Sequence, residues 1–257
     1  MKFIREPNVY LVGKQGVSPE ELDRFLTDHE AKEWKTDTTV GAEKLCEIAG
    51  RLCYMSYGKG RKTNHEYLGH ILEVGHGSVL EHAAWNFIIT GVSRSFTHEL
   101  IRHRAGFGYS QLSQRYVDEA DTDFVEPDCI GDDPEMHKMF VETCEKAQDA
   151  YVKLTEKLAE KFKDVPDRTL RRKMARQAAR AVLPNATETK IFVTANARGL
   201  RNFFELRGSE HAETEIRKVA VKMLKIMQKE SPSMFGDYSF RPLPDGTEEA
   251  NTKFKKV

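Results

Sequence analysis

One stretch of the chain combines fixed positive charge with many hydrogen-bond donors. Residues 102–115 read Arg-His-Arg-Ala-Gly-Phe-Gly-Tyr-Ser-Gln-Leu-Ser-Gln-Arg and contain three arginines, one histidine and no acid. Guanidinium groups bind phosphates through paired, charge-assisted hydrogen bonds. The stretch therefore predicts a loop that binds an anionic ligand, most simply a phosphate.

Two simpler explanations of this stretch are weaker. Arginines at a helix C-terminus interact favourably with the helix dipole, by roughly 0.3–1 kcal/mol each. This does not account for the polar residues that follow, which are Ser110, Gln111, Ser113, Gln114 and Arg115. A nucleic-acid surface is the second explanation. The zero net charge and the lack of a known nucleic-acid-binding module argue against it. A binding loop on a folded scaffold explains the whole stretch.

A second polar segment lies upstream, where residues 76–82 read His-Gly-Ser-Val-Leu-Glu-His. Two histidines and a glutamate could bind a metal ion. However, their spacing is not the helical His-x-x-x-His pattern, and no third group of ligands stands out. We therefore predict no metal site and a structural role for Glu81 and His82.

A third segment, residues 196–207, predicts a helix with two polar faces. Arg198 and Asn202 are four residues apart and share a face, whereas Arg207 lies nine residues beyond Arg198, about 180° around the helix. A solvated surface helix is the alternative, but the segment is too apolar for free solvent. We expect its apolar part to be buried between subunits, so that each face serves a different site. The apolar residues are Leu200, Phe203, Phe204 and Leu206.

The rest of the chain predicts a single domain over residues 1–257, with a loose polar tail from about 232. The net charge is zero, so no general attraction to nucleic acid or membranes is expected. No apolar run approaches the ~18–20 residues of a membrane span, and the N-terminus lacks a signal-peptide core. The four cysteines lack zinc-type pairing, which indicates a reduced, cytoplasmic protein.

Periodicity predicts the elements that must position these segments. Pro134 begins a helix with an apolar stripe along it, and Ser18 and Ser93 are candidate helix caps. Cys46 and Cys53 share a predicted core-facing helix side. Strands are expected at 9–12, 84–90 and 191–193, and helices at 19–25, 42–54, 64–74, 94–102, 134–158, 167–180, 196–206 and 211–228.

Taken together, the three segments resemble the flavin-dependent thymidylate synthases. The signature of that family is Arg-His-Arg, seven residues, Ser, any residue, Arg; here the spacer is eight residues, 105–112. Residues 76–82 resemble the family's His-x-Ser/Thr-x-x-Glu-His segment. Residues 196–207 resemble its Asn-x-Arg-x-x-x-Asn segment with the arginine that follows it, and Arg180 precedes a matching Val-Leu-Pro.

The resemblance implies an enzyme that methylates dUMP to dTMP. Methylenetetrahydrofolate would donate the carbon, and NADPH would supply reducing equivalents through FAD. The implied fold is a mixed α/β domain, with an antiparallel sheet flanked by helices, assembled as a homotetramer. No Gly-x-Gly-x-x-Gly fingerprint is present, so FAD must be bound in another way.

The resemblance also implies the residues of each site. The FAD site would comprise Ser78, Arg102, His103, Arg104, Gln111, Asn196, Arg198, Asn202 and His211. The dUMP site would comprise Glu99, Gln111, Ser113, Gln114, Arg115, Arg180 and Arg207, with Arg207 as the catalytic residue and His76 on the folate side. Two rival functions remain: a non-catalytic nucleotide or RNA module, and a flavin reductase for another substrate.

Overall fold

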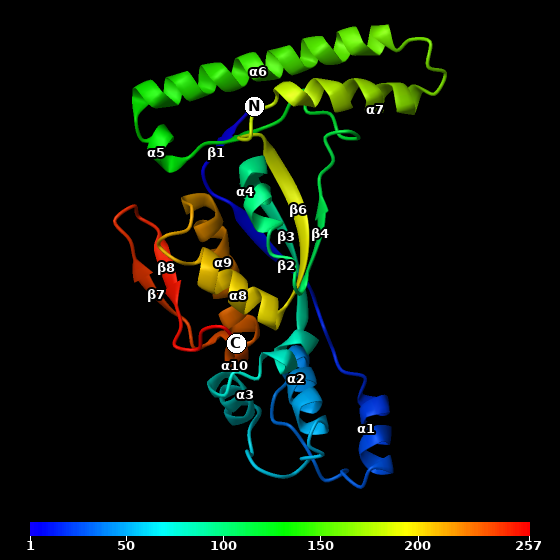
Figure 1. Cartoon of the computed structure of the whole chain (residues 1–257), viewed down its shortest axis with the longest axis vertical. Helices are drawn as coiled ribbons and strands as arrows, with labels where there is room; N and C mark the ends of the chain where they lie inside the picture. The colour runs from blue at the N-terminus through cyan, green and yellow to red at the C-terminus, as the bar shows by residue number, and fades with distance from the viewer. The chain divides into compact units, whose positions relative to one another are not determined.

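A four-stranded sheet with strand order β2-β3-β6-β4 is built from segments far apart in the sequence (Figure 1). Its strands are β2 (Asn8–Lys14), β3 (Ala84–Ser93), β6 (Glu188–Asn196) and β4 (Phe107–Gln111). The computed structural model describes residues 1–257 as a mixed α/β fold with helices and an antiparallel sheet, as the family resemblance implies. No helix is both long enough and apolar enough to cross a membrane.

The chain divides into two compact units. Unit 1 contains residues 1–8, 89–101 and 110–191, and unit 2 contains residues 9–88, 102–109 and 192–257. The division falls inside the strands of the four-stranded sheet, so each unit takes a part of every one of them.

Unit 1 contains mainly helices and a short parallel strand pair. Its elements are β1 (Phe3–Ile4), α4 (Arg94–Leu100), β5 (Phe124–Val125), α5 (Asp128–Gly131), α6 (Pro134–Lys161), α7 (Arg168–Ala179) and the 3₁₀ turn η2 (Arg180–Val182). The Ser93 hydroxyl accepts a hydrogen bond from the amide of Phe96, 3.0 Å away, so the predicted cap of α4 is confirmed.

The apolar stripe predicted along α6 is only partly buried. Cys144 and Tyr151 are buried, but Met136 and Leu154 remain 45% and 38% exposed. The reason is geometric: α6 has 28 residues and packs along α7, which has only 12. The shorter helix cannot cover the whole stripe.

Unit 2 contains the remaining helices and an antiparallel hairpin. Its elements are α1 (Pro19–Asp28), α2 (Gly41–Leu52), α3 (Asn64–Glu73), the 3₁₀ helix η1 (Gly77–His82), α8 (Ala197–Arg207), α9 (Thr214–Glu230), α10 (Pro232–Phe235), β7 (Ser239–Pro242) and β8 (Glu248–Asn251). Strand β3 alternates as predicted, and its side chains Trp85 and Phe87 are fully buried in the core.

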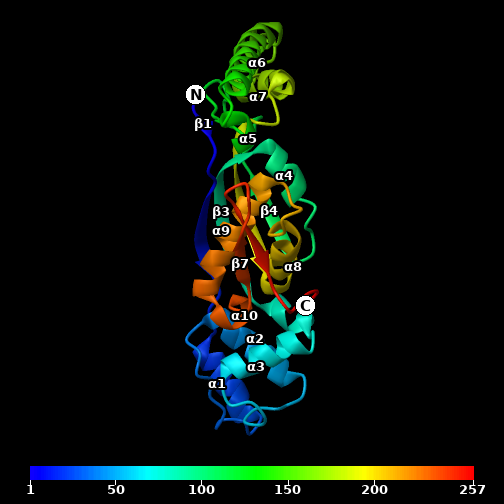
Figure 2. The same ribbon diagram turned by 90° about the vertical axis from the view of Figure 1, so that its left-hand side faces the viewer.

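Three local expectations in unit 2 differ from the structure. Ser18 precedes α1 but makes no side-chain cap, and Cys53 is exposed because it follows the last turn of α2 instead of lying on its core face. Residues after 232 form α10 and the β7–β8 hairpin instead of a loose tail. The hairpin lies beside α8 and α9 (Figure 2). Phe235 of α10 and Ala250 of β8 are buried, and these apolar side chains hold the otherwise polar stretch against the rest of unit 2.

A buried ion pair holds the loop after α2. The side chains of Arg51 and Glu47 are 3% and 1% exposed, and the Arg51 Nε donates to Glu47 Oε1 at 2.8 Å. The other guanidinium nitrogens of Arg51 donate to the carbonyl oxygens of Ser56, Lys59 and Arg61. One buried cation thus pairs with a buried carboxylate and binds three carbonyl oxygens of the loop backbone.

Replacing this arginine should strongly destabilise the protein. Arg51→Met leaves the Glu47 carboxylate buried without its cation, so we expect the free energy of unfolding to fall by roughly 3–5 kcal/mol. Arg24→Met is the matched control, since Arg24 pairs with Glu21 on the exposed surface of α1 and should contribute about 0–1 kcal/mol. Urea unfolding of the wild-type protein and the two variants measures both losses of unfolding free energy. Equal losses for Arg51→Met and Arg24→Met would contradict the stabilising role of the buried pair.

Candidate functional site

The first turn of α8 is fastened to the loop before β4. Asn196 caps the helix, because its Oδ1 accepts a hydrogen bond from the backbone amide of Gly199 at 2.8 Å. The backbone amide of Asn196 donates to the Gly106 carbonyl oxygen at 2.9 Å. Gly106 has φ +76°, and a Cβ there would lie 2.3 Å from Asn196 Oδ1. Only glycine fits this position, so the lengthened spacer is accommodated by a turn that lies against the start of α8.

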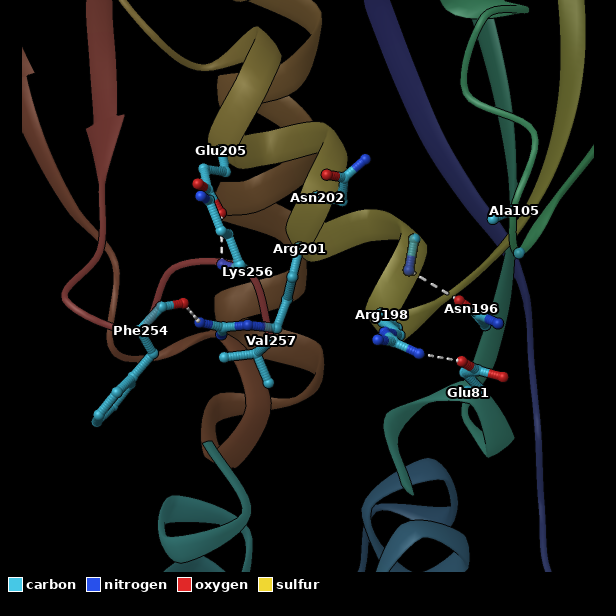
Figure 3. Close-up of a pocket in the computed structure, with 12 residues that line it drawn as sticks. Glu81, Ala105, Asn196, Arg198, Arg201, Asn202, Glu205, Phe254, Lys256 and Val257 are labelled. Atoms are coloured by element: carbon cyan, nitrogen blue, oxygen red, sulfur yellow. Dashed lines mark hydrogen bonds and ion pairs between the residues drawn. The ribbon is translucent and has the colours of Figure 1, made fainter. Parts of the chain in front are cut away.

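A cavity of about 360 Å³ opens beside this turn (Figure 3). Asn196, Arg198 and Asn202 all line it. The helix face that Arg198 and Asn202 share, as their four-residue spacing predicts, is therefore the face exposed to the cavity. The Arg198 guanidinium pairs with the Glu81 carboxylate of η1 at 2.5 Å. The full lining is Glu81, Ala105, Gly106, Asn196, Arg198, Gly199, Arg201, Asn202, Glu205, Phe254, Lys256 and Val257.

Other residues expected at the FAD or folate site do not line this cavity. Ser78 lies on η1 and His76 directly precedes it, and both side chains are exposed. Arg102 and Arg104 are also exposed, and the exposed ring of His211 lies 3.9 Å from the Glu210 carboxylate. The structure thus brings three of the expected FAD residues, Asn196, Arg198 and Asn202, to the cavity. Ser78, Arg102, Arg104 and His211 are exposed, His103 is buried, and Gln111 belongs to unit 1.

His103 has an environment unlike that of its two arginine neighbours. It is 7% exposed, and its ring makes aromatic contacts with Phe107 and Phe203. Its Nε2 accepts a hydrogen bond from the Arg207 Nε at 3.0 Å, so its own proton is on Nδ1. Burial, with the charges of Arg207 and Arg102, lowers the His103 pKa from 6.5 to about 4. The imidazole is therefore a neutral acceptor that orients Arg207.

In unit 1, the residues expected to bind dUMP lie on α4, at and just after the end of β4, and on η2. Gln111 donates from its amide to the hydroxyls of Thr97 and Thr189, at 3.2 and 3.3 Å. The Ser113 hydroxyl accepts the Arg115 amide at 3.3 Å. Glu99 lies half-buried on α4.

Several polar atoms of this region of unit 1 are buried without a partner. They include Gln114 Nε2, Arg115 Nε and one terminal nitrogen of Arg94. Burial lowers the Arg94 pKa; the Glu119 carboxylate opposes this shift, and the charge of Arg180 adds to it. Buried, unpaired donors are costly unless a ligand satisfies them, and guanidinium groups favour an anion. Arg94 was not expected from the sequence; its only signal is that it directly follows the cap residue Ser93.

Comparison with known proteins places the chain in a family. Residues 36–233 match the family model described as "Thymidylate synthase complementing protein". A flavin-dependent thymidylate synthase of Mycobacteroides abscessus is 52% identical over 221 residues, which are 85% of this chain and 88% of that protein. One of Mycobacterium tuberculosis strain H37Ra is 51% identical over 222 residues, with the same coverage. The chain belongs to the flavin-dependent thymidylate synthase family.

A solved structure agrees with the fold. The UMP/dUMP methylase PolB of Streptomyces cacaoi, crystallised with 5-Br UMP, superposes with a TM-score of 0.63 at 20% identity. The match covers 92% of this chain and 95% of that one, so nearly the whole architecture is shared. The resemblance to the family that the three polar segments indicate is confirmed by the family match and the relatives.

The cavity also contains residues that the sequence did not single out. Glu81 was expected to be structural, yet it lines the cavity and pairs with Arg198. Arg201 and Glu205 also face the cavity, and their four-residue spacing on α8 could have revealed them. Residues 254, 256 and 257 gave no sequence signal, because they reach α8 only through the tertiary fold.

The neutral state of His103 predicts a distinct pH response. The unfolded chain takes up a proton on this histidine near pH 6.5, whereas the folded protein does so only near 4. The stability that this residue contributes is therefore fully present above pH 6.5 and is lost as the pH falls toward 4.

Nitrogen NMR of histidine-labelled protein should show the His103 ring neutral at about pH 5.5. The His103→Gln variant identifies its signal and should weaken the pH dependence of unfolding over the same range. A ring that titrates near pH 6.5 would contradict the buried, Arg207-bonded state.

Proposed function

We propose that the protein methylates dUMP to dTMP, with methylenetetrahydrofolate as carbon donor and NADPH as reductant through bound FAD. The observation that carries the proposal is the cavity lined by Asn196, Arg198 and Asn202, in a chain of the flavin-dependent thymidylate synthase family.

The cavity suits FAD by the chemistry of its donors. Arg198 offers a cation for the pyrophosphate, and the amide groups of Asn196 and Asn202 can donate to or accept from neutral polar groups. The close approach of Gly106 keeps the rim free of side-chain bulk. We assign Ser78, Arg102, Arg104, Gln111 and His211 to the same cofactor. The resemblance also implied His103 at the FAD site, but its ring is buried and accepts a hydrogen bond from Arg207, so we assign it to Arg207 instead. Bound FAD would supply the transfer of reducing equivalents.

The residues of unit 1 supply the proposed binding groups for dUMP. The unpaired donors of Gln114 and Arg115, with the guanidinium groups of Arg94 and Arg180, fit a phosphate dianion. Glu99, Gln111 and Ser113 would complete the nucleotide contacts.

Arg207 is the proposed catalytic residue. Its guanidinium would stabilise negative charge that develops on the uracil ring. His103 accepts a hydrogen bond from the Arg207 Nε–H, which fixes the orientation of the guanidinium. Its low pKa keeps the imidazole uncharged, so no second positive charge forms beside Arg207. We therefore infer that His103 acts on the substrate through Arg207.

The assembly and co-substrates belong to the same proposal. A homotetramer would bury the exposed apolar side chains Leu206 on α8 and Met139 on α6, which are 54% and 62% exposed. His76 is assigned to the folate side. We also propose that the protein acts in the cytoplasm.

The deciding experiment measures flavin and dUMP dependence together. Protein mixed with FAD and desalted should retain the flavin spectrum, and it should form dTMP from dUMP and methylenetetrahydrofolate. NADPH oxidation that requires dUMP would exclude a flavin reductase for another substrate. Protein that retains no flavin at micromolar concentration would refute the proposal and favour a plain nucleotide-binding module.

Single substitutions on the two faces of α8 should separate the two ligands. Arg207→Ala should weaken dUMP binding about tenfold to a hundredfold, since a charge-assisted hydrogen bond contributes roughly 1.5–3 kcal/mol, and should leave FAD binding intact. Arg198→Ala should weaken FAD binding and leave dUMP binding intact. Calorimetric titration of each ligand into each variant tests this, with Arg168→Ala on α7 as control. Unchanged dUMP affinity of Arg207→Ala would remove Arg207 from the site.

No cysteine should be needed for turnover. Burial raises the pKa of Cys46 to about 12 and that of Cys144 to about 11, so neither forms a thiolate readily, and Cys53 and Cys129 are exposed outside the sites described. We expect each Cys→Ala variant that folds and binds FAD to form dTMP at nearly the wild-type rate. Loss of turnover with both ligands still bound would point to a thiol nucleophile.

A further inference from the structure

The cavity has a wall that the family signatures do not include. Phe254, Lys256 and Val257 line it beside α8, and they lie outside residues 36–233 matched by the family model (Figure 3). We call residues 252–257 the wall segment. Its position beside α8 needs a physical cause, because most of its sequence is polar.

Arg201 supplies the first attachment. This arginine is 2% exposed, and its guanidinium donates to Asp237 at 2.7 and 2.9 Å and to the Phe254 carbonyl oxygen at 3.1 Å. The Asp237 carboxylate also accepts the hydroxyl of Thr252, which in turn accepts the Phe254 amide at 3.0 Å. The Arg201 guanidinium lies 4.9 Å from the centre of the Tyr238 ring. One buried cation thus ties the start of the wall segment to α8.

Glu205 supplies the second attachment, one helical turn further along α8. Its Oε2 accepts the Lys256 amide at 2.9 Å. Val257 is 7% exposed, and a Cβ at Gly77 would lie 2.6 Å from the Val257 carbonyl carbon and 2.9 Å from Arg198 Nε. The far end of the wall segment therefore lies close to Gly77, beside the cavity arginine.

The wall segment also brings charge to the cavity. Lys253, Lys255 and Lys256 are exposed, but of these three only Lys256 lines the cavity. A cation here complements Arg198, whose charge is partly neutralised by Glu81. Such a wall suits an anionic ligand better than the α8 face does alone.

We propose that the wall segment is part of the FAD site, with Arg201 and Glu205 as the positioning residues that hold it and Lys256 as its cation toward the cofactor. This inference rests on the proposed function, which places FAD in the cavity. The dUMP residues assigned in unit 1 lie outside the wall segment, so its loss should affect the two ligands unequally.

The test measures the dissociation constant of FAD by flavin fluorescence and that of dUMP by calorimetry. Removing residues 254–257 should weaken FAD about tenfold or more and leave dUMP affinity within about twofold. Lys256→Ala should weaken FAD roughly two- to fivefold, whereas Lys255→Ala, its exposed neighbour, should not. Glu205→Ala should weaken FAD, and Glu205→Gln should restore it, because the amide oxygen still accepts the Lys256 amide.

Hydrogen exchange of the intact protein provides a second reading that needs no variant. Added FAD should slow exchange of the amides of residues 254–257. Equal FAD affinity of the shortened and wild-type proteins would overturn the proposal. If the shortened protein does not fold, the proposal is overturned when Lys256→Ala binds FAD as tightly as wild type and added FAD leaves the hydrogen exchange of residues 254–257 unchanged. Wild-type protein that binds no FAD would instead refute the proposed function.

Discussion

The geometry of the candidate site depends on one close approach, that between the first turn of α8 and the turn at Gly106. Asn196 ends β6, caps α8 and donates to the Gly106 carbonyl oxygen, so strand, helix and loop are joined through one residue. The positive φ of Gly106 and the 2.3 Å that would separate a Cβ there from Asn196 Oδ1 leave no room for any other side chain. This junction fixes the start of α8, from which its polar side chains project.

From that junction, the helical period distributes the polar side chains of α8 among different tasks. Arg198 and Asn202 face the cavity, Arg201 and Glu205 hold residues 252–257, and Arg207 meets His103. The helix can carry so much charge because each buried or half-buried cation has a defined partner. Arg201 has Asp237, with side chains only 2% and 9% exposed, and an unpaired charge at that depth would be costly.

Burial and neighbouring charges set the protonation state of His103 in the Arg-His-Arg segment of unit 2. His103 lies between two exposed arginines in sequence, yet its ring is buried against aromatic side chains and stays neutral. A neutral imidazole can accept the Arg207 Nε–H, whereas an imidazolium could not. The Arg-His-Arg motif therefore combines two surface cations with one buried acceptor.

The sequence alone determined the family, the chemistry and much of the local structure. The spacing in 102–115, 76–82 and 196–207 identified the family before any contact was known, and helix signals such as Pro134 and Ser93 located element starts. These features are local, since caps, periodicity and motif spacing act within a few residues.

Only the tertiary structure decided which of the expected residues meet. It brought Asn196, Arg198 and Asn202 to a cavity, left Ser78 and His211 exposed, buried His103 and added Arg94. It also folded residues 232–257, whose polar composition indicated a loose tail, against α8 and α9. The physical reason is that burial and long-range hydrogen bonds, such as those of Arg201 to Asp237 and Phe254, join residues dozens of positions apart, and no local pattern in the sequence encodes them.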